Sequence, residues 1–133
     1  MSIEEKNRVF NSGDFKSLSD SQRRIFRQVV EDLDERGIFR PTDLAIIASY
    51  ARNVILARLA SKELEKNGIM ITEVDKYHGT KKKQNPAVDI LQKAQISMEK
   101  TAALLGLTPT GRKRLKDEQN IKTASEAWDE RED

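Results

Sequence analysis

The stretch LAIIASYARNVILARLA, at residues 44–60, restricts the possible folds more than any other part of this chain. Thirteen of its 17 residues are apolar. The polar ones are Ser49, Arg52, Asn53 and Arg58. A surface helix of a single domain shows one apolar stripe, whereas this segment has enough apolar side chains for two. We therefore expect a helix that packs against its own domain and also against a neighbouring subunit, and the two arginines argue against a simple membrane span.

This central helix is expected to begin around Pro41–Asp43, because proline favours a first helical turn, and to end at Gly68. At about 1.5 Å per residue it is long for so small a domain. We place the expected oligomer interface on this helix. The residues predicted to form that interface are Ile47, Tyr50, Val54, Ile55 and Leu59.

Weaker patterns on either side predict a mainly α-helical domain. A capping box at Ser19 and Gln22 starts a helix whose apolar stripe continues to Gly37. From Pro86 a helical period returns and ends at Gly106, and a short fourth helix is expected after it. The helix after Ser19 and the helix after Pro86 are thus each predicted from both a start signal and a glycine end.

Between the two long helices the sequence predicts a small β-ribbon or an extended insertion. IMITEV is rich in β-branched residues, DKYHG has the composition of a turn, and TKKKQ can pair back as a polar strand. The expected architecture is a long helical hairpin that carries this insertion between its two long helices, with short N- and C-terminal helices.

Charge and periodicity divide the chain of 133 residues into three parts. Residues 1–17 lack periodicity and are expected to be a flexible arm, and residues 18–116 a single helical domain. Residues 117–133 have seven acids and two bases, a net charge of −5, so residues 1–116 carry +7 of the total of +2. We expect an acidic, disordered tail that binds a partner through Trp128, and the alternative in which Trp128 folds back onto the domain stays open. A tail that only aids solubility is the alternative.

No part of the sequence is arranged for catalysis. The single histidine, His78, lies in the expected turn, and HExxH, GxxxxGK[ST] and GxSxG motifs are absent. The chain has no cysteine, which excludes disulfides and thiolate metal sites. We therefore predict that the protein is not an enzyme and uses no cofactor or metal. The polar N-terminus predicts an intracellular protein without a signal peptide.

Cations are concentrated where a helix disfavours them. LGLTPTGRKRLK, at Leu105–Lys116, places four cations in the first turns of a helix, whose N-terminal end is itself partly positive. The helix that starts at Ser19 likewise has its bases first and its acids last. A bound phosphate resolves this conflict, because free N–H groups and arginines together suit an anion. The residues predicted to bind DNA are Arg23, Arg24, Arg27, Lys81, Lys82, Lys83, Arg112, Lys113, Arg114 and Lys116.

An interpretation of these clusters that involves no DNA binding also stays open. Each one can be a solvated face, or the acids of one helix can pair with the bases of another. If extended, Lys81–Lys83 point to alternate faces, which suits an exposed arm near DNA and a disordered loop equally well. Contacts of this kind supply an attraction to DNA that depends on salt and hardly on base sequence.

LGLTPTGRKRL follows a helix that opens with Asn85–Pro86 and an earlier long helix that contains Tyr50. Together they resemble the C-terminal signature of one family of tailed-phage terminase small subunits. The likeness covers roughly Leu18 to Lys116. It implies a non-catalytic packaging factor that forms a homo-oligomeric ring, recognises the packaging site on double-stranded viral DNA and delivers the DNA to the terminase large subunit. The large subunit has the ATPase and nuclease activities, and the work is done in the host cell cytoplasm during phage assembly.

The resemblance also implies roles by position. Arg112–Lys116 would belong to the DNA-handling surface, and the apolar second and third helices to the wall between subunits. The tail with Trp128 would meet the large subunit or the portal.

Two other functions stay open. LGLTPTGRKRL can be the turn and recognition helix of a dimeric helix-turn-helix DNA-binding regulator. The same apolar surface also suits a phage adaptor or structural ring protein that does not bind DNA.

Overall fold

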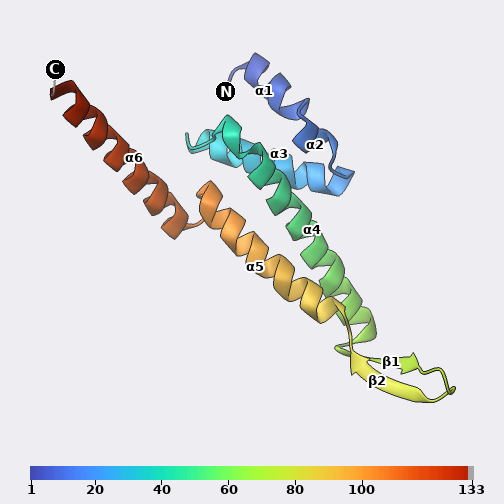
Figure 1. Ribbon diagram of the computed structural model, residues 1–133. Coiled ribbons are helices and arrows are strands. Elements are labelled where there is room, and N and C mark those ends of the chain that lie inside the picture. Colours follow the sequence, from blue (N-terminus) through green and yellow to red (C-terminus); the bar gives the residue numbers. More distant parts are fainter. Residues whose placement is uncertain (132–133) are drawn as a thin grey trace.

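The fold, taken from a computed structural model, is described for the backbone of residues 1–131 and the side chains of residues 1–121. Two long helices, α4 (Leu44–Asn67) and α5 (Ala87–Leu105), lie side by side as a helical hairpin (Figure 1). A short 3-10 turn, η1 (Pro41–Asp43), leads into α4. The predicted mainly α-helical fold and the two long helices are confirmed.

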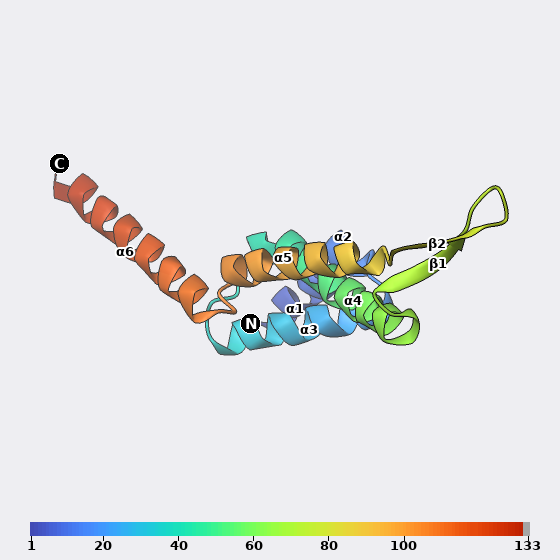
Figure 2. The same cartoon turned by 90° about the horizontal axis from the view of Figure 1, so that it is seen from below.

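The predicted ribbon between the long helices is also confirmed. β1 (Met70–Val74) and β2 (Thr80–Gln84) form a two-stranded antiparallel sheet that projects beyond the end of the helical hairpin (Figures 1 and 2). Asn85, which is 3% exposed, fixes its base. The amide nitrogen of Asn85 donates to the carbonyl of Gly68 over 3.0 Å, and its amide oxygen accepts from the N–H of Ala87 over 3.0 Å. One side chain therefore joins the end of α4 to the start of α5.

The main core lies between α3 (Asp20–Glu35) and α4. α3 begins with the predicted capping box of Ser19 and Gln22. Its buried side chains share one helical face, which is why periodicity alone located this helix. The core residues of the pair are Ile25, Phe26, Val29, Val30 and Leu33 on α3, with Ile47, Ala48, Ala51 and Val54 on α4.

The N-terminal segment differs from the flexible arm expected for residues 1–17. It forms α1 (Ile3–Phe10) and α2 (Gly13–Lys16), and Val9 and Phe15 are buried in the same core as α3. Helices of 8 and 4 residues are too short to show a clear apolar period. Helices of this length are also unstable alone, so it is the packing on α3 that stabilises them.

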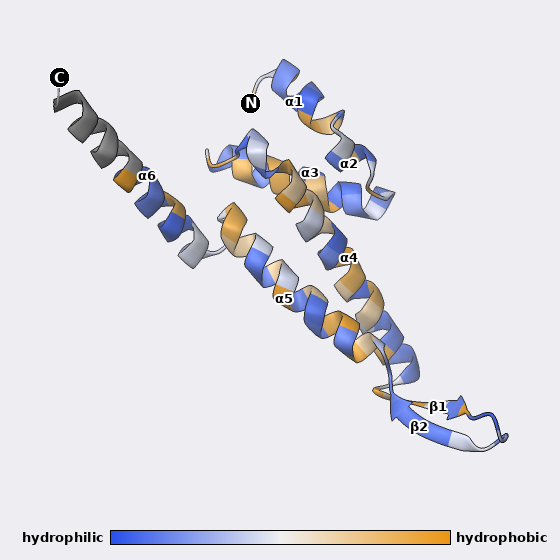
Figure 3. Cartoon of the chain, in the orientation of Figure 1, coloured by the Kyte–Doolittle hydropathy of each residue, from blue (hydrophilic) through white to orange (hydrophobic). Residues whose placement is uncertain are grey.

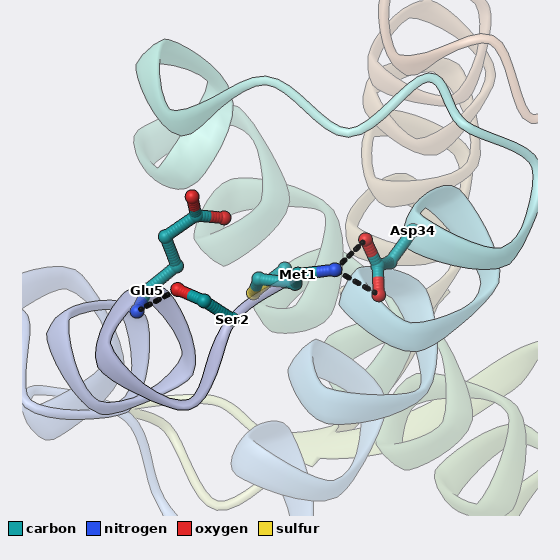
Figure 4. A network of polar contacts seen from close by, with 4 residues as sticks. All are labelled: Met1, Ser2, Glu5 and Asp34. Atoms are coloured by element: carbon teal, nitrogen blue, oxygen red, sulfur yellow. Dashed lines mark hydrogen bonds and ion pairs between the residues drawn. The ribbon is translucent and has the colours of Figure 1, made fainter.

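Aromatic packing and one ion pair hold this segment on α3. The rings of Phe10, Phe15 and Phe26 lie with centroids 5.3 to 6.4 Å apart in edge-on or tilted arrangements. The ammonium group of Met1 lies 3.3 Å from the carboxylate of Asp34 (Figure 4, which also shows the side-chain cap of α1). The start of the chain is therefore part of the folded domain.

The C-terminal part of the chain, like its N-terminal part, contains more helix than the sequence predicted. α6 (Pro109–Arg131) is a long helix where the sequence predicted a short one and then a disordered tail. It extends away from the rest of the protein (Figures 1 and 2). The residues from Lys116 to Asn120 are all polar, and the coloured part of α6 is mostly blue with separate orange segments (Figure 3), so periodicity could not locate the rest of this helix. Lys, Arg, Glu and Gln are nevertheless good helix formers, and they are frequent in this segment.

Among the described residues, one helical segment, Pro41–Asn67, is long and apolar enough by composition to cross a membrane. Core helices of water-soluble proteins pass the same test. Here the segment packs against both α3 and α5 and carries Arg52 and Arg58 in its middle. Packing on these two sides therefore explains the buried part of its apolar surface.

Candidate nucleic-acid interface

The three predicted basic clusters lie on separate surfaces. Arg23–Arg27 occupy the first half of α3, Lys81–Lys83 lie on β2, and Arg112–Lys116 lie at the start of α6. The ribbon and α6 extend from opposite ends of the α4–α5 hairpin in both views (Figures 1 and 2). A single chain therefore does not combine them into one patch.

On α3, two of the three predicted arginines contact α2. Arg23 donates from Nη2 to the carbonyl of Lys16 over 2.7 Å and from Nε to the carbonyl of Phe15 over 3.3 Å. Its guanidinium carbon lies 5.3 Å from the centre of the Phe15 ring, and that of Arg27 lies 5.1 Å from the same ring. Arg24 is exposed. Carbonyls at the end of a helix lack partners within it, so Arg23 is stabilised by the end of α2 although it lies near the start of α3.

Arg52 of α4 joins this cluster, although it was not among the predicted binding residues. Its Nη2 donates to Oγ of Ser17 over 2.9 Å, and Ser17 Oγ donates in turn to the carbonyl of Asp14 over 3.1 Å. Arg52 lies far from Ser17 in sequence, within an apolar stretch, and only the packing of α2 against α4 brings the two together. No local pattern in the sequence could have shown this contact.

On the ribbon, the lysines divide between the two faces, as expected for consecutive strand residues. Lys81 pairs in register with Glu73, and Lys82 with Thr72 on the opposite face. The ammonium of Lys83 lies 3.3 Å from the carboxylate of Glu73. Glu73 therefore offsets part of the charge on one face, and Lys82 projects from a face without acids.

The turn of the ribbon has a structural explanation that includes the single histidine. His78 has a positive φ of 61°, and Oδ1 of Asp75 accepts from the N–H groups of Tyr77 and Gly79 over 2.8 and 2.9 Å. The carboxylate of Asp75 thus bonds to the backbone of the residues that follow it and stabilises the tight turn. In the part of the chain that the structure describes, no group of three or more His, Asp or Glu side chains is arranged to hold a metal ion.

At the start of α6, the cations divide between helix capping and ion pairing. Nη1 of Arg112 lies 3.4 Å from the carbonyl oxygens of both Gly106 and Leu107, at the end of α5. Nε of Arg114 lies 3.8 Å from the carboxylate of Glu118, one turn further along α6. Arg112 therefore stabilises the junction between α5 and α6, because cations are favoured at the C-terminal end of a helix.

The other predicted cations have no carboxylate within ion-pairing distance among the side chains of residues 1–121. They are Arg23, Arg24, Arg27, Lys81, Lys82, Lys113 and Lys116, and Arg52 shares this property. Most of the predicted DNA-binding residues therefore keep their charge available to an external anion.

The predicted oligomer interface is only partly on the surface. Ile47 and Val54 are 0% and 7% exposed and pack in the core of their own chain, so we reassign them to that core. Tyr50 and Ile55 are half-buried, and Leu59 is 58% exposed. Buried and exposed apolar residues follow one another closely along α4. Their spacing in the sequence therefore does not show which of them face α3.

A family comparison now adds to this geometry. A family model described as phage terminase, small subunit, matches residues 23–122. The chain belongs to this family. Comparison with curated proteins and with solved structures finds no significant match.

The match to the terminase small subunits covers α3, α4, the ribbon, α5 and the first half of α6. It therefore includes all three basic clusters and the apolar helical hairpin, and it leaves out α1 and α2. The family predicted from the resemblance is confirmed. The particular role of the LGLTP segment stays a prediction. Trp128 lies beyond the match and outside the residues whose side chains the structure describes.

Proposed function

We propose that this terminase small subunit is a non-catalytic packaging factor that binds double-stranded viral DNA at the packaging site as a homo-oligomeric ring. It recruits or regulates the large subunit, which supplies the ATPase and nuclease activities. It acts in the host cell cytoplasm during phage assembly. Family membership supports the general role, and the surface of the chain supports the parts that concern DNA and assembly.

The observation that carries the DNA-binding proposal is the set of exposed cations without carboxylate partners. Arg24 on α3, Lys81 and Lys82 on the ribbon, and Lys113 and Lys116 on α6 are all exposed. Unpaired lysines and arginines release condensed ions from DNA when they bind its phosphates, which gives an affinity that depends strongly on salt.

The apolar surface of the helical hairpin supports assembly. Leu56 and Leu59 are 43% and 58% exposed on α4. A groove of about 470 Å³ also runs between α4 and α5, where Tyr50, Leu91 and Met98 contribute to its lining. An exposed apolar surface of this kind on a small domain is typical of a contact with another subunit, which removes it from water. A head-to-tail contact between copies closes into a ring when the rotation permits.

The acidic C-terminal segment is proposed to meet the large subunit. Residues 117–133 carry a net charge of −5, opposite in sign to the rest of the chain, and would be repelled by DNA. α6 extends away from the helical domain, so this segment can reach a partner while the domain holds DNA (Figure 1). Trp128 is the residue proposed to anchor that contact.

Two measurements on the purified full chain test this function. Light scattering should show an oligomer larger than a dimer at micromolar concentration, and DNA affinity should fall steeply as salt rises. A monodisperse monomer would contradict the ring. A dimer that protects two half-sites about one helical turn apart would favour a regulator of transcription instead. A ring without DNA affinity would favour the structural adaptor.

A matched pair of substitutions tests the assembly surface. Leu59→Asp should shift the scattering mass towards the monomer while the circular dichroism spectrum is retained, because a charge would be buried between subunits. Ile3→Asp, on a side chain that is 78% exposed in α1, is the control and should leave the mass unchanged. Equal masses for Leu59→Asp and the original chain would exclude this part of α4 from the interface.

A further inference from the structure

Three guanidinium groups gather around the last turn of α2, although they come from two other helices. Arg23 and Arg27 of α3 lie 5.3 and 5.1 Å from the centre of the Phe15 ring. Arg23 also donates to the carbonyl of Lys16 over 2.7 Å, and Arg52 of α4 donates to Oγ of Ser17 over 2.9 Å. Consecutive residues of one turn thus determine the positions of all three arginines.

Such a group of like charges is unfavourable unless an anion is present. No carboxylate among the described side chains of residues 1–121 pairs with any of the three arginines. The acids nearest in sequence, Asp14 and Asp20, lie in the first turns of α2 and α3, where the helix dipoles favour a negative charge. Among the described side chains, the three guanidinium groups around Ser17 therefore have no carboxylate within ion-pairing distance.

The arginines are also fixed in place while part of their hydrogen-bonding capacity stays free. Arg23 and Arg52 use only some of their N–H donors in the bonds to Lys16 and Ser17. The remaining N–H donors of each guanidinium group are available to an anion. Arg27 and Arg52 are exposed, and so is Ser17. Because the stacking on Phe15 and the bonds to α2 already restrict the side chains, binding an anion there costs less conformational entropy. The planar fork of arginine matches the oxygens of a phosphate group.

We infer that the turn at Ser17 is a phosphate-binding site, formed by Arg23, Arg27 and Arg52, at which the backbone of the DNA duplex docks. This inference rests on the proposed function and makes it more specific, because it assigns a DNA contact to α4 and to a turn before the family match. It also separates this site from the start of α6, where Arg112 caps α5 and Arg114 pairs with Glu118.

The test measures the affinity of the full-length protein for a labelled DNA duplex by fluorescence anisotropy over a series of salt concentrations. Arg52→Gln removes the charge, and its side chain is too short to keep the bond that Nη2 donates to Ser17. We expect affinity to fall about 5- to 10-fold and the salt slope to decrease by about one. Arg27→Gln should have a similar effect, and the double variant a larger one. Arg52→Lys, which keeps the charge, should lose about threefold or less.

Arg58→Gln is the matched control, because it removes the same charge from an exposed arginine of the same helix. Arg58 also lines the groove between α4 and α5, so light scattering first checks that Arg58→Gln keeps the mass of the original chain. With the mass unchanged, its affinity should stay within about twofold of the original. Circular dichroism and the melting temperature of each variant show whether the fold is retained. Since Arg52 is on the surface, Arg52→Gln is expected to fold normally.

The outcomes separate the inference from the proposed function. If the original chain binds DNA and both Arg52→Gln and Arg27→Gln bind equally well, docking of DNA at the Ser17 turn is wrong and the DNA-binding proposal stands. If the original chain shows no salt-dependent binding, both are wrong. Inorganic phosphate at constant ionic strength gives a third arm. If it raises the melting temperature of the original chain but not of Arg52→Gln, while both bind DNA equally, the site takes free phosphate and docking of DNA is refuted.

Discussion

The starts of α3 and α6 have the same pattern in sequence but different surroundings in the structure. Both place arginines in the first turns of a helix, and in both an arginine donates to the carbonyls that end the preceding helix. At α3 the neighbours are aromatic rings and Arg52, without a carboxylate partner among the described residues. At α6 Glu118 pairs with Arg114, and the helix leaves the domain.

The comparison shows that a cation at a helix start is not by itself a sign of a ligand. The charges of Arg23 and Arg112 destabilise the positive N-terminal ends of their own helices. They stabilise the negative C-terminal ends of the preceding helices, which lie beside them.

Both sites keep cations without a carboxylate partner among the described side chains, and at α6 these include Lys113 and Lys116. What distinguishes the two sites is that three arginines from two helices converge on the turn at Ser17, whereas Arg112 caps α5 and Arg114 pairs with Glu118. We therefore interpret Arg112 and Arg114 as parts of the α5–α6 junction, and Lys113 and Lys116 as the cations of α6 that stay available to DNA.

The largest expected effect tests the junction at Gly111. This residue is buried in the first turn of α6, and a Cβ added there would overlap the backbone carbonyl of Ala103 in α5. The obstacle is backbone and cannot rotate away. We expect Gly111→Ala to destabilise the α5–α6 junction by about 2–4 kcal/mol. Hydrogen exchange of α6 amides, or urea unfolding monitored by circular dichroism, measures the change.

Gly13→Ala is the control for this substitution. A Cβ added at Gly13 meets nothing within 4 Å and φ there is not positive. The variant should be neutral or more stable by up to about 1 kcal/mol, since alanine reduces the entropy of the unfolded chain. Equal stability of Gly111→Ala and Gly13→Ala would show that α6 does not pack on α5 at this point.

A smaller effect separates the two capping arginines. Replacing either Arg23 or Arg112 by Met keeps the apolar stem and removes hydrogen bonds to carbonyls, so each should cost about 1–2 kcal/mol of unfolding free energy. Only Arg23→Met should also weaken DNA binding, because Arg23 belongs to the Ser17 site. Thermal unfolding and DNA anisotropy on the two variants give this comparison. Equal loss of DNA affinity in both would mean that Arg112 also contacts DNA.

Much of the fold could be predicted from sequence because its signals are local. The capping box at Ser19, the glycines after α4 and α5, and the β-branched run before the turn each act within a few residues. α1 and α2 were missed because their stability comes from Phe15 and Val9 packing on α3, which is a tertiary effect. α6 was underestimated because its helix-forming residues show no apolar period.

The candidate site was predictable only in part, for the same reason. Arg23, Arg24 and Arg27 stand together in the sequence, so their clustering was visible. Arg52 reaches the same turn through the packing of α4 against α2, and a sequence does not show which helices touch. Likewise, the apolar composition of α4 indicates that two of its faces are buried, but it does not indicate which residues point into the core of the chain. That is why Ile47 was assigned to an interface and is found in the core.

The smallest expected effect concerns the ion pair on α6. Arg114 and Glu118 are both largely exposed, with 47% and 60% of their side chains accessible. Glu118→Gln should therefore change stability by no more than about 0.5 kcal/mol. It also removes a negative charge beside Arg114, so its effect on DNA affinity compares the two helix starts directly. If Arg114 serves mainly to hold the junction, affinity for DNA stays within about twofold in the anisotropy assay. A clearly tighter complex would mean that Glu118 competes with phosphate for Arg114, and the two arginine-rich helix starts would then share one function.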